Sequence, residues 1–439
     1  MFSAVRKPAL PLTALAVSTA LLLSGCGSNV LGSGGDVTLR LVVADYGDSP
    51  ANSSNLYWND LVKRFEQANP GIKIALEVVI WDDIDKRVAE LIKSGKIPDM
   101  LQTGGYADHV AAGRLYPVSE VLTIDAQVNT IDAFAKAGQV LGSQYGIPFI
   151  ASSRAFFYNK AIFEKAGITQ PPTSWEELRK DAKLIKQKVP GVVPYGLPLG
   201  PEEAQAESLM WTTSGGGGLA DDAGNYSIDS TANRATFEWL RTNLVKDGLT
   251  YADPGTVNRK TAFADFAAGK IAMLNGHPAL VQKAVAAKID YGLAQIPRKD
   301  PQGKAAGFAV ADWMMAFKAN GHRAEIKKFL SFTYQKENTL KFYETYNMLP
   351  VTQDARVQMA ADSAHADLKP FLDALPDARF YPYGEPSWAK VSEQLKKEIG
   401  GAVKDGGGET LARLQTAGPR GGRGGPPPPP PEAAAEARK

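Results

Sequence analysis

The sequence predicts an α/β fold in which helices cover a parallel sheet. Strand-like and helix-like segments alternate from residue 37 to residue 102, and this order favours parallel strands joined by helical crossovers. The 439 residues are 44% hydrophobic and 22% charged, which is typical of a soluble chain with a sizeable core. At about 150 residues per domain, the length indicates roughly two to three domains.

Five elements account for residues 37–102. Residues 37–44 are apolar and β-branched, as in a buried strand. Residues 55–69 place apolar side chains at helical spacing and end at Asn-Pro-Gly, which predicts a helix. Residues 72–78 alternate between apolar and polar side chains, which predicts a second strand. A second helix over 84–94 and a short third strand over 98–102 complete the unit.

The later elements repeat these patterns. A strand is expected over 154–160, and Ser174 with Glu177 three residues on forms a capping box that opens a helix. The remaining predictions are helices over 233–245, 324–335 and 339–346, a helical turn from 263 to 268, and a strand over 270–275.

The first 35 residues have the pattern of an export signal and a tether. Arg6 and Lys7 precede an apolar stretch over 9–23 that is too short to span a bilayer comfortably. The sequence Leu-Ser-Gly-Cys at 23–26 looks like a bacterial lipobox. We therefore expect a lipoprotein signal peptide over 1–25, acylation of Cys26, and a flexible tether over 26–35.

The last 21 residues differ in composition from the body of the chain. Residues 419–439 contain Gly-Gly pairs, six consecutive prolines and an Ala/Glu/Arg end. This segment has nothing to bury, so we expect a disordered tail.

Charge and cysteine content exclude several classes of protein. The net charge is +2, and the two terminal segments carry enough positive charge to leave the body slightly acidic. The body therefore lacks the basic surface of a nucleic-acid-binding protein. A single cysteine excludes a disulfide framework and a multi-cysteine metal site. The four histidines have no metal-ligand spacing and no catalytic motif stands out, so no cofactor and no metal are expected.

Several segments together resemble one family. These segments are the helix and strand at 58–72, Ser-Gly-Lys-Ile-Pro-Asp-Met at 94–100, Tyr-Gly-Ile-Pro-Phe at 145–149 with Phe-Tyr-Asn-Lys at 157–160, Pro-Pro to Leu at 171–178, and Phe-Ala-Ala-Gly-Lys-Ile-Ala-Met at 266–273. They occur in the order seen in the extracellular solute-binding proteins of carbohydrate ABC importers, the maltose-binding-like group. The resemblance extends over roughly 37–415.

The resemblance implies a periplasmic-binding-protein-like fold. Two α/β lobes would be joined by a hinge that the chain crosses more than once, with the ligand cleft between them. The first lobe would take 36–148 and 277–331, and the second 149–276 and 332–418. A monomer held at the extracytoplasmic face of the cell membrane by its lipid anchor would capture a mono-, di- or oligosaccharide. It would deliver this ligand unmodified to the permease subunits, so no catalytic residue is expected.

Candidate ligand contacts follow from the strand ends. A sugar offers C–H faces to aromatic rings and hydroxyls to polar groups, and a buried polar group left unpaired costs about 1–3 kcal/mol. In open α/β sheets the ligand lies beyond the carboxyl ends of the strands. The candidates near such ends, or in the loops and turns that follow, are Asp45, Tyr46, Trp81, Gln102, Thr103, Tyr106, Ser152, Glu202, Gln205, Trp211, Gly216, Asn275, His277, Asp312 and Trp313. The resemblance adds Tyr383, near the end of the body, where family members place a last aromatic contact.

Alternative interpretations remain for these residues and for the whole chain. Trp81, Trp211 and Trp313 are expected in loops, where each either contacts the ligand or packs within a lobe. Trp58, Trp175 and Trp239 lie on predicted helix faces and are expected in the core. The same fold with a polyamine or peptide ligand is one alternative function. A lipid-anchored carbohydrate-active enzyme is another, because abundant carboxylates could supply a catalytic pair.

Overall fold

The computed structural model describes residues 36–47, 49–81, 83–221, 225–302 and 307–418. The expected signal peptide, Cys26, the tether and the tail lie outside these residues. Within them, no helix is both long enough and apolar enough to cross a membrane.

The first sheet contains the strands expected near the N-terminus. Within the described residues its order is β12-β11-β3-β1-β2, and β6 also pairs with β11. Its strands are β1 (Val37–Asp45), β2 (Ile72–Ile80), β3 (Met100–Thr103), β6 (Ile147–Ser153), β11 (Gly307–Ala316) and β12 (Ala378–Arg379). The pairs β1–β2 and β1–β3 are parallel, as predicted, whereas β11 runs antiparallel to both β3 and β6.

The second sheet is smaller and is mixed. Within the described residues its order is β10-β7-β9-β8, with β8 (Val193–Gly196) parallel to β9 (Ile271–Gly276). The strands β7 (Ala155–Asn159) and β10 (Tyr291–Ala294) complete it, and β7 runs antiparallel to both neighbours. A hairpin of β4 (Gln139–Val140) and β5 (Ser143–Gln144) stands apart from both sheets.

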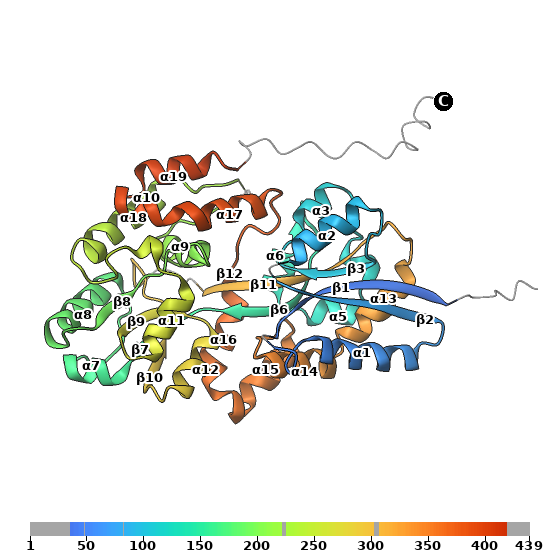
Figure 1. Ribbon diagram of the computed structural model, residues 1–439, viewed down its shortest axis with the longest axis horizontal. Helices are drawn as coiled ribbons and strands as arrows, with labels where there is room; N and C mark the ends of the chain where they lie inside the picture. Colours follow the sequence, from blue (N-terminus) through green and yellow to red (C-terminus); the bar gives the residue numbers. More distant parts are fainter. Residues whose placement is uncertain (1–35, 48, 82, 222–224, 303–306, 419–439) are drawn as a thin grey trace, which may run out of the picture. The chain divides into compact units, whose positions relative to one another are not determined.

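Helices pack around both sheets (Figure 1). Those before β7 are α1 (Asn55–Ala68), α2 (Ile84–Lys93), α3 (Ala107–Ala111), α4 (Val118–Val121), α5 (Ile124–Asn129) and α6 (Asp132–Ala137). Those from β7 to β11 are α7 (Lys160–Ala166), α8 (Trp175–Lys188), α9 (Ala204–Ser214), α10 (Thr231–Leu240), α11 (Arg259–Ala267) and α12 (Pro278–Ala286). Those after β11 are α13 (Arg323–Thr333), α14 (Lys336–Tyr346), α15 (Gln353–Ala361), α16 (Lys369–Ala374), α17 (Trp388–Glu398), α18 (Ala402–Asp405) and α19 (Gly408–Gln415).

Short helical segments complete the described chain. A π-helical turn (Arg241–Val245) extends α10, so the helix predicted over 233–245 changes its hydrogen-bond pattern after Leu240. The remaining segments are 3₁₀ turns at Pro254–Thr256, Ser363–Leu368, Leu375–Asp377 and Ile399–Gly401.

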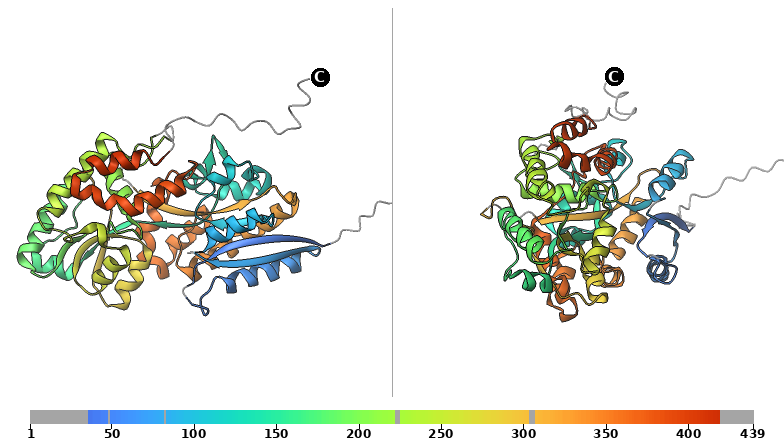
Figure 2. Two further views of the ribbon diagram at one scale, coloured as in Figure 1. Left: turned by 45° about the horizontal axis from the view of Figure 1, so that its top comes forward. Right: turned by 60° about the vertical axis from the view of Figure 1, so that its left-hand side comes forward.

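The local sequence explains where several elements begin and pack. The Ser174 side chain accepts a hydrogen bond from the Glu177 backbone N–H at 3.2 Å, and Glu177 accepts one from the Thr173 N–H at 2.7 Å. The predicted capping of α8 is thus present, although Glu177 reaches one residue further back than in the standard capping box. Trp58 and Trp175 are fully buried, as expected for core residues, whereas Trp239 is only partly buried. Figure 2 shows α1 running alongside β1 and β2.

Strand pairing places some segments differently from the expected lobe boundaries. Residues 277–331 were expected together in the first lobe, but β10 within this range pairs with β7 of the second sheet. Residues 332–418 were expected in the second lobe, but β12 pairs with β11 of the first sheet, and Leu349 bridges to Ala151 in β6. We therefore propose a first lobe of 36–153 with 307–383, and a second of 154–294 with 384–418. The chain would cross between them near residues 154, 300 and 384.

Candidate ligand-binding site

A hydrogen-bonded triad stands at the carboxyl edge of the first sheet. Tyr46 follows β1, Gln102 lies in β3, and Asp312 lies in β11 beside the end of β3. The Tyr46 hydroxyl donates to Asp312 Oδ2 at 2.7 Å and accepts from Gln102 Nε2 at 2.6 Å. Burial raises the pKa of the Asp312 carboxyl to about 6, although the Tyr46 hydrogen bond acts to lower it. The structure thus brings together three of the candidate residues. The strand-end rule selected Tyr46 and Gln102, whereas Asp312 was expected after a turn at Gly307-Phe308 and lies instead within β11.

Trp81 lies beside this triad and presents an open ring surface. It follows the end of β2, and its side chain is 37% exposed. Its ring meets the Tyr46 ring edge-on, with centroids 5.6 Å apart. A Cβ added to Gly104 would lie 3.9 Å from both Trp81 Cζ3 and Asp312 Oδ1, so glycine leaves open space between these two side chains. An exposed indole next to hydrogen-bonding groups is a suitable platform for the C–H face of a ring-shaped ligand.

A buried aromatic column, rather than exposed loops, contains Trp313. The expectation that Trp313 lies in a loop is wrong, because it is in β11, pairs with Thr103 and is fully buried. Its ring centroid lies 5.1 Å from that of Tyr106 and 5.1 Å from that of Tyr383. Tyr106 donates to the Ala137 carbonyl, and the Tyr383 hydroxyl accepts from the Ala311 N–H. In this structure the three aromatic residues pack behind the cleft edge.

Two further candidates at the same edge, Asp45 and Thr103, hydrogen-bond to other residues of the first lobe. Asp45 accepts hydrogen bonds from the side chains of Ser53 and Ser54 and from the backbone N–H of Gly47 and Ser54. Burial opposes ionisation of Asp45, but these hydrogen bonds hold its pKa below the ordinary value. Thr103 is buried and donates to Asp85 at 3.3 Å. Both side chains therefore already have structural partners.

The second lobe contains an indentation lined by a buried carboxyl group. It is shallow, with room for about 10 Å³ of solvent in this structure, and its lining includes Glu207 and Asn275. Glu207 is 3% exposed, and a single oxygen, Oε1, accepts from Trp211 Nε1 at 2.9 Å, Tyr195 Oη at 3.2 Å and Asn275 Nδ2 at 3.3 Å. Burial raises the pKa of Glu207 to about 8, because removal from water penalises the charged form.

Trp211 is therefore held inside the second lobe. The expectation that it lies in a loop is wrong, because it belongs to α9 and is buried. Its ring lies 5.3 Å from Trp175 and 5.9 Å from Trp239, centroid to centroid. Its contribution to the site is the indole N–H that orients Glu207.

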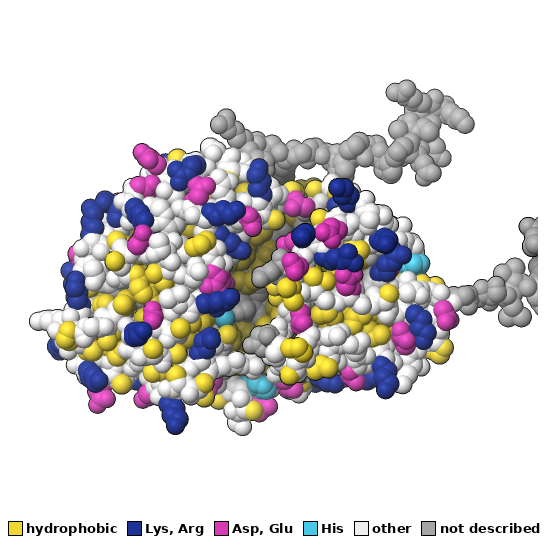
Figure 3. Space-filling view, viewed as in Figure 1, with side chains coloured by type: hydrophobic (Ala, Val, Ile, Leu, Met, Phe, Trp, Pro, Cys, Tyr) yellow, Lys and Arg dark blue, Asp and Glu magenta, His cyan; other side chains and the backbone are white. Residues whose placement is uncertain are grey.

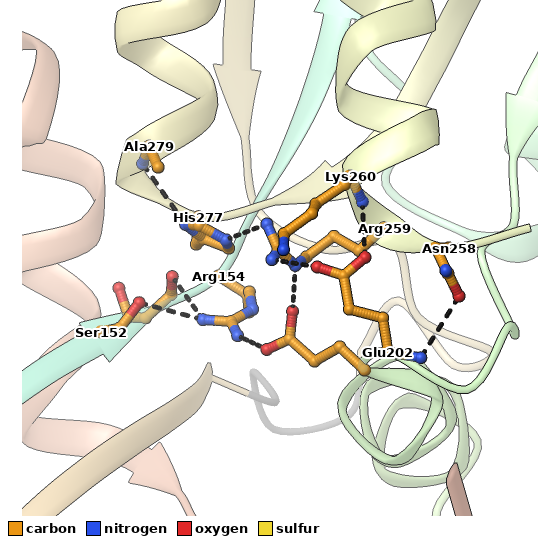
Figure 4. Close-up of polar contacts among 10 residues, drawn as sticks. Ser152, Arg154, Glu202, Asn258, Arg259, Lys260, His277 and Ala279 are labelled. Atoms are coloured by element: carbon orange, nitrogen blue, oxygen red, sulfur yellow. Dashed lines mark hydrogen bonds and ion pairs between the residues drawn. The ribbon is translucent and has the colours of Figure 1, made fainter. Parts of the chain in front are cut away.

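A network of ion pairs lines the rest of the indentation (Figure 4). Arg154, the single residue between β6 and β7, pairs with Glu203 at 2.5 Å and donates to Ser152 Oγ at 3.0 Å. Arg259 pairs with both Glu202 and Glu203 at 2.5 Å. Arg259 Nη1 also lies 3.0 Å from His277 Nε2. Ser152, Glu202 and His277 were sequence candidates, and the structure brings them into one cluster.

The last two predicted residues occupy different positions. Gln205 is buried in the first turn of α9, and its Oε1 has no hydrogen-bond partner among the described residues. Gly216 lies in the turn after α9 with φ of +85° and no atom within 4 Å of an added Cβ. Its conformation favours glycine, and nothing in its surroundings indicates a ligand contact.

Sequence reasoning missed four residues that line the second-lobe indentation. These are Arg154, Glu203, Glu207 and Arg259. One signal was available for Glu207, because it is the only charged side chain in the α9 segment Ala-Gln-Ala-Glu-Ser-Leu-Met-Trp-Thr-Thr-Ser. No comparable signal identifies Arg154 or Arg259, since their roles depend on contacts between distant parts of the chain.

One face of the molecule is hollowed. Figure 3 shows a hollow across the molecule, with hydrophobic side chains on its floor and charged side chains along its rims. Among the described residues, no three His, Cys, Asp or Glu side chains are grouped so as to hold a metal ion. The chemistry available is hydrogen bonding, ring stacking and ion pairing, which suits recognition of a small polar molecule.

Comparisons with known proteins identify the family. The model of the bacterial extracellular solute-binding proteins matches residues 51–339. A binding protein of Brucella abortus (strain 2308) is 32% identical over 381 residues, which cover 85% of this chain and 90% of that protein. The sn-glycerol-3-phosphate-binding periplasmic protein UgpB of Salmonella typhimurium is 27% identical, over 72% of this chain and 75% of that protein.

A solved structure gives the same result for the fold. The cyclic α-maltosyl-1,6-maltose binding protein of Arthrobacter globiformis aligns with a TM-score of 0.72 at 19% sequence identity. The alignment covers 87% of this chain and 98% of that one. This likeness confirms the predicted two-lobe α/β fold of the periplasmic solute-binding proteins. The chain therefore belongs to the family of bacterial extracellular solute-binding proteins.

Proposed function

We propose that this protein is the substrate-binding component of an ABC importer and that its solute is a carbohydrate. The observation that carries this proposal is the first-lobe edge, where the exposed Trp81 ring adjoins Tyr46, Gln102 and Asp312. A sugar ring needs both kinds of surface, since its C–H faces are apolar and its hydroxyls must be paired when they leave water. Several structural relatives are named as binders of maltose or related sugars, which supports the same ligand class.

The second lobe would supply the opposing contacts. Its indentation offers Glu207 and Asn275, which line it and hydrogen-bond each other. A ligand can favour closure only by binding the closed form more tightly than the open form. Contacts to both lobes at once would provide that difference in affinity.

The remaining sequence predictions complete the proposal. Acylation of Cys26 would hold the protein at the extracytoplasmic face of the cell membrane, with 26–35 as a tether. The protein would act there as a monomer and deliver its ligand, unmodified, to the permease subunits. A polyamine or peptide ligand is the second candidate, because Asp312 and Glu207 lie near the aromatic residues of the site. The enzyme alternative predicts turnover of a glycan by the purified protein.

Isothermal titration calorimetry with a panel of neutral mono-, di- and oligosaccharides tests the proposal. Trp81→Ala should weaken binding of the best sugar more than 10-fold, because it removes the ring on which the sugar would stack. Tyr116→Ala, which removes a part-buried ring that lies over Lys318, serves as the control and should leave the affinity unchanged. Binding of spermidine or oligopeptides in preference to every sugar would refute the carbohydrate assignment.

A further inference from the structure

The charged side chains of the second-lobe indentation already neutralise one another. Arg154, Arg259 and Glu203 line it, and Glu202 pairs with Arg259 beside it. The formal charges of these two arginines and two glutamates sum to zero. Arg154 also donates to Ser152 Oγ and to the Ser153 carbonyl. Neither guanidinium group lacks a carboxylate partner.

The two carboxylates also have several hydrogen-bond and ion-pair partners. Glu202 accepts from the Lys260 backbone N–H at 3.0 Å, and its own N–H donates to Asn258 Oδ1 at 3.3 Å. Glu203 bridges the two arginines, with one oxygen 2.5 Å from Arg154 and the other 2.5 Å from Arg259. The guanidinium groups also stack on Phe308 and Phe263, at 5.4 and 5.1 Å from the ring centroids. An incoming anion would have to displace a carboxylate from this arrangement.

His277 does not provide a positive charge either. Its Nδ1 lies 3.3 Å from the Ala279 N–H, and its Nε2 lies 3.0 Å from Arg259 Nη1. Both ring nitrogens thus face N–H donors, which disfavours protonation. Burial and the nearby charges of Arg154 and Arg259 lower the pKa of His277 well below its ordinary value.

The polar atoms left without partners suit hydroxyl groups. Asn275 Oδ1 is buried and accepts no hydrogen bond within the described residues. The three groups that donate to Glu207 all bond to its Oε1. Its second carboxyl oxygen, Oε2, accepts no hydrogen bond within the described residues. The two side chains hydrogen-bond each other and line the same indentation, so their free oxygens are neighbours. A hydroxyl group can both donate to one and accept from the other when the carboxyl is protonated.

We propose that this indentation selects an uncharged polyhydroxy ligand and rejects its phosphorylated counterpart, with Glu202 and Glu203 as the specificity-determining residues. The inference rests on the proposed function and narrows the ligand class. It predicts a preference opposite to that indicated by the name of the glycerol-phosphate-binding relatives. Phosphate would meet arginines that already pair with carboxylates, and it would be repelled by the negative charge of those two carboxylates.

Matched pairs of neutral and phosphorylated probes test this selectivity. Calorimetry would compare glucose with glucose 1-phosphate, maltose with maltose 1-phosphate, and glycerol with sn-glycerol-3-phosphate. For the pair whose neutral member binds best, the phosphorylated member should bind at least 100-fold more weakly. Glu203→Gln removes the negative charge that pairs with both Arg154 and Arg259. It should lower the ratio of the two dissociation constants, phosphorylated to neutral, at least 10-fold. Glu202→Gln removes a negative charge that pairs only with Arg259, so it should lower this ratio less.

A surface variant controls for the change in net charge. Glu398→Gln removes a partly buried carboxylate of α17 that pairs with Arg413 of α19 at the same 2.5 Å, and it should leave the ratio unchanged. The inference is overturned if the wild-type protein binds the phosphorylated probe as tightly as the neutral one, or if Glu203→Gln leaves the ratio unaltered. Neither of these two results would contradict the proposed function. Failure of every neutral sugar to bind would instead overturn the proposed function and this inference together.

Discussion

Replacing Glu207 by glutamine tests whether the second-lobe carboxyl group is protonated in the folded protein. The amide is close to the protonated acid in shape, and its oxygen can accept the same hydrogen bonds from Trp211, Tyr195 and Asn275. The substitution therefore removes the titration while preserving the packing. Any pH dependence that distinguishes the variant from the wild-type protein reports on the protonation of Glu207.

The magnitude follows from proton linkage. Burial raises the pKa of Glu207 from 4.5 to about 8. Between these values the folded state keeps a proton that the unfolded state has lost, so the free energy of unfolding falls as pH rises. The slope is about 1.4 kcal/mol per pH unit, which amounts to about 3 kcal/mol between pH 5.5 and pH 7.5. Glu207→Gln has no such titration. Its free energy of unfolding, relative to that of the wild type, should therefore rise by about 3 kcal/mol from pH 5.5 to pH 7.5.

Urea denaturation followed by tryptophan fluorescence, repeated from pH 5 to pH 9, would measure the difference. Asp181→Asn provides a matched control, because burial also raises the pKa of Asp181, but only to about 6. The stability difference for Asp181→Asn should stop changing above about pH 6, whereas that for Glu207→Gln should keep changing to about pH 8. A Glu207→Gln difference that is flat across the range would show that Glu207 is ionised in the folded protein. The proposed donor role of its Oε2 would then be wrong.

Two further substitutions probe the remaining contacts of the site. Tyr46→Phe removes the hydroxyl between Gln102 and Asp312; it should cost about 1–3 kcal/mol in urea denaturation, and NMR titration should show a higher Asp312 pKa, because the hydrogen bond that lowers it is lost. Trp211→Ala empties a buried position beside Trp175 and should cost about 3–5 kcal/mol in the same assay; a loss below 1 kcal/mol would contradict its core position.

The fold was largely predictable because its elements have regular sequence patterns. The alternation in residues 72–78 and the apolar run at 37–44 correspond to β2 and β1, which pair in parallel as expected. The sequence could not show that β10 joins the second sheet or that β12 joins the first. Both strands are short. The sheet that each one joins depends on contacts with residues distant in sequence, and local periodicity does not show these contacts.

The site was predictable where residues follow strand ends and not where they lie within helices. Tyr46, Gln102 and Asp312 were selected by position and do meet. Trp211 was expected in a loop, yet it lies in the last turn of a buried helix. Glu207 was overlooked because a polar residue in a helix ordinarily faces water, and only the tertiary contacts show that it does not.

The two sheets are joined where β6 continues into β7. Only Arg154 separates the two strands, so the first sheet ends where the second begins. Because β7 runs antiparallel to β9, Ala155 pairs with Gly276 at the carboxyl end of β9. Because β3 and β6 are both antiparallel to β11, their carboxyl ends point the same way, but β6 runs on past the end of β3: Thr103 pairs with Trp313, and Ser153 pairs with Ala309. The carboxyl ends of β6 and β9 therefore lie next to each other at Arg154. In the proposed two-lobe cleft, this junction would bring together polar residues that are far apart in sequence.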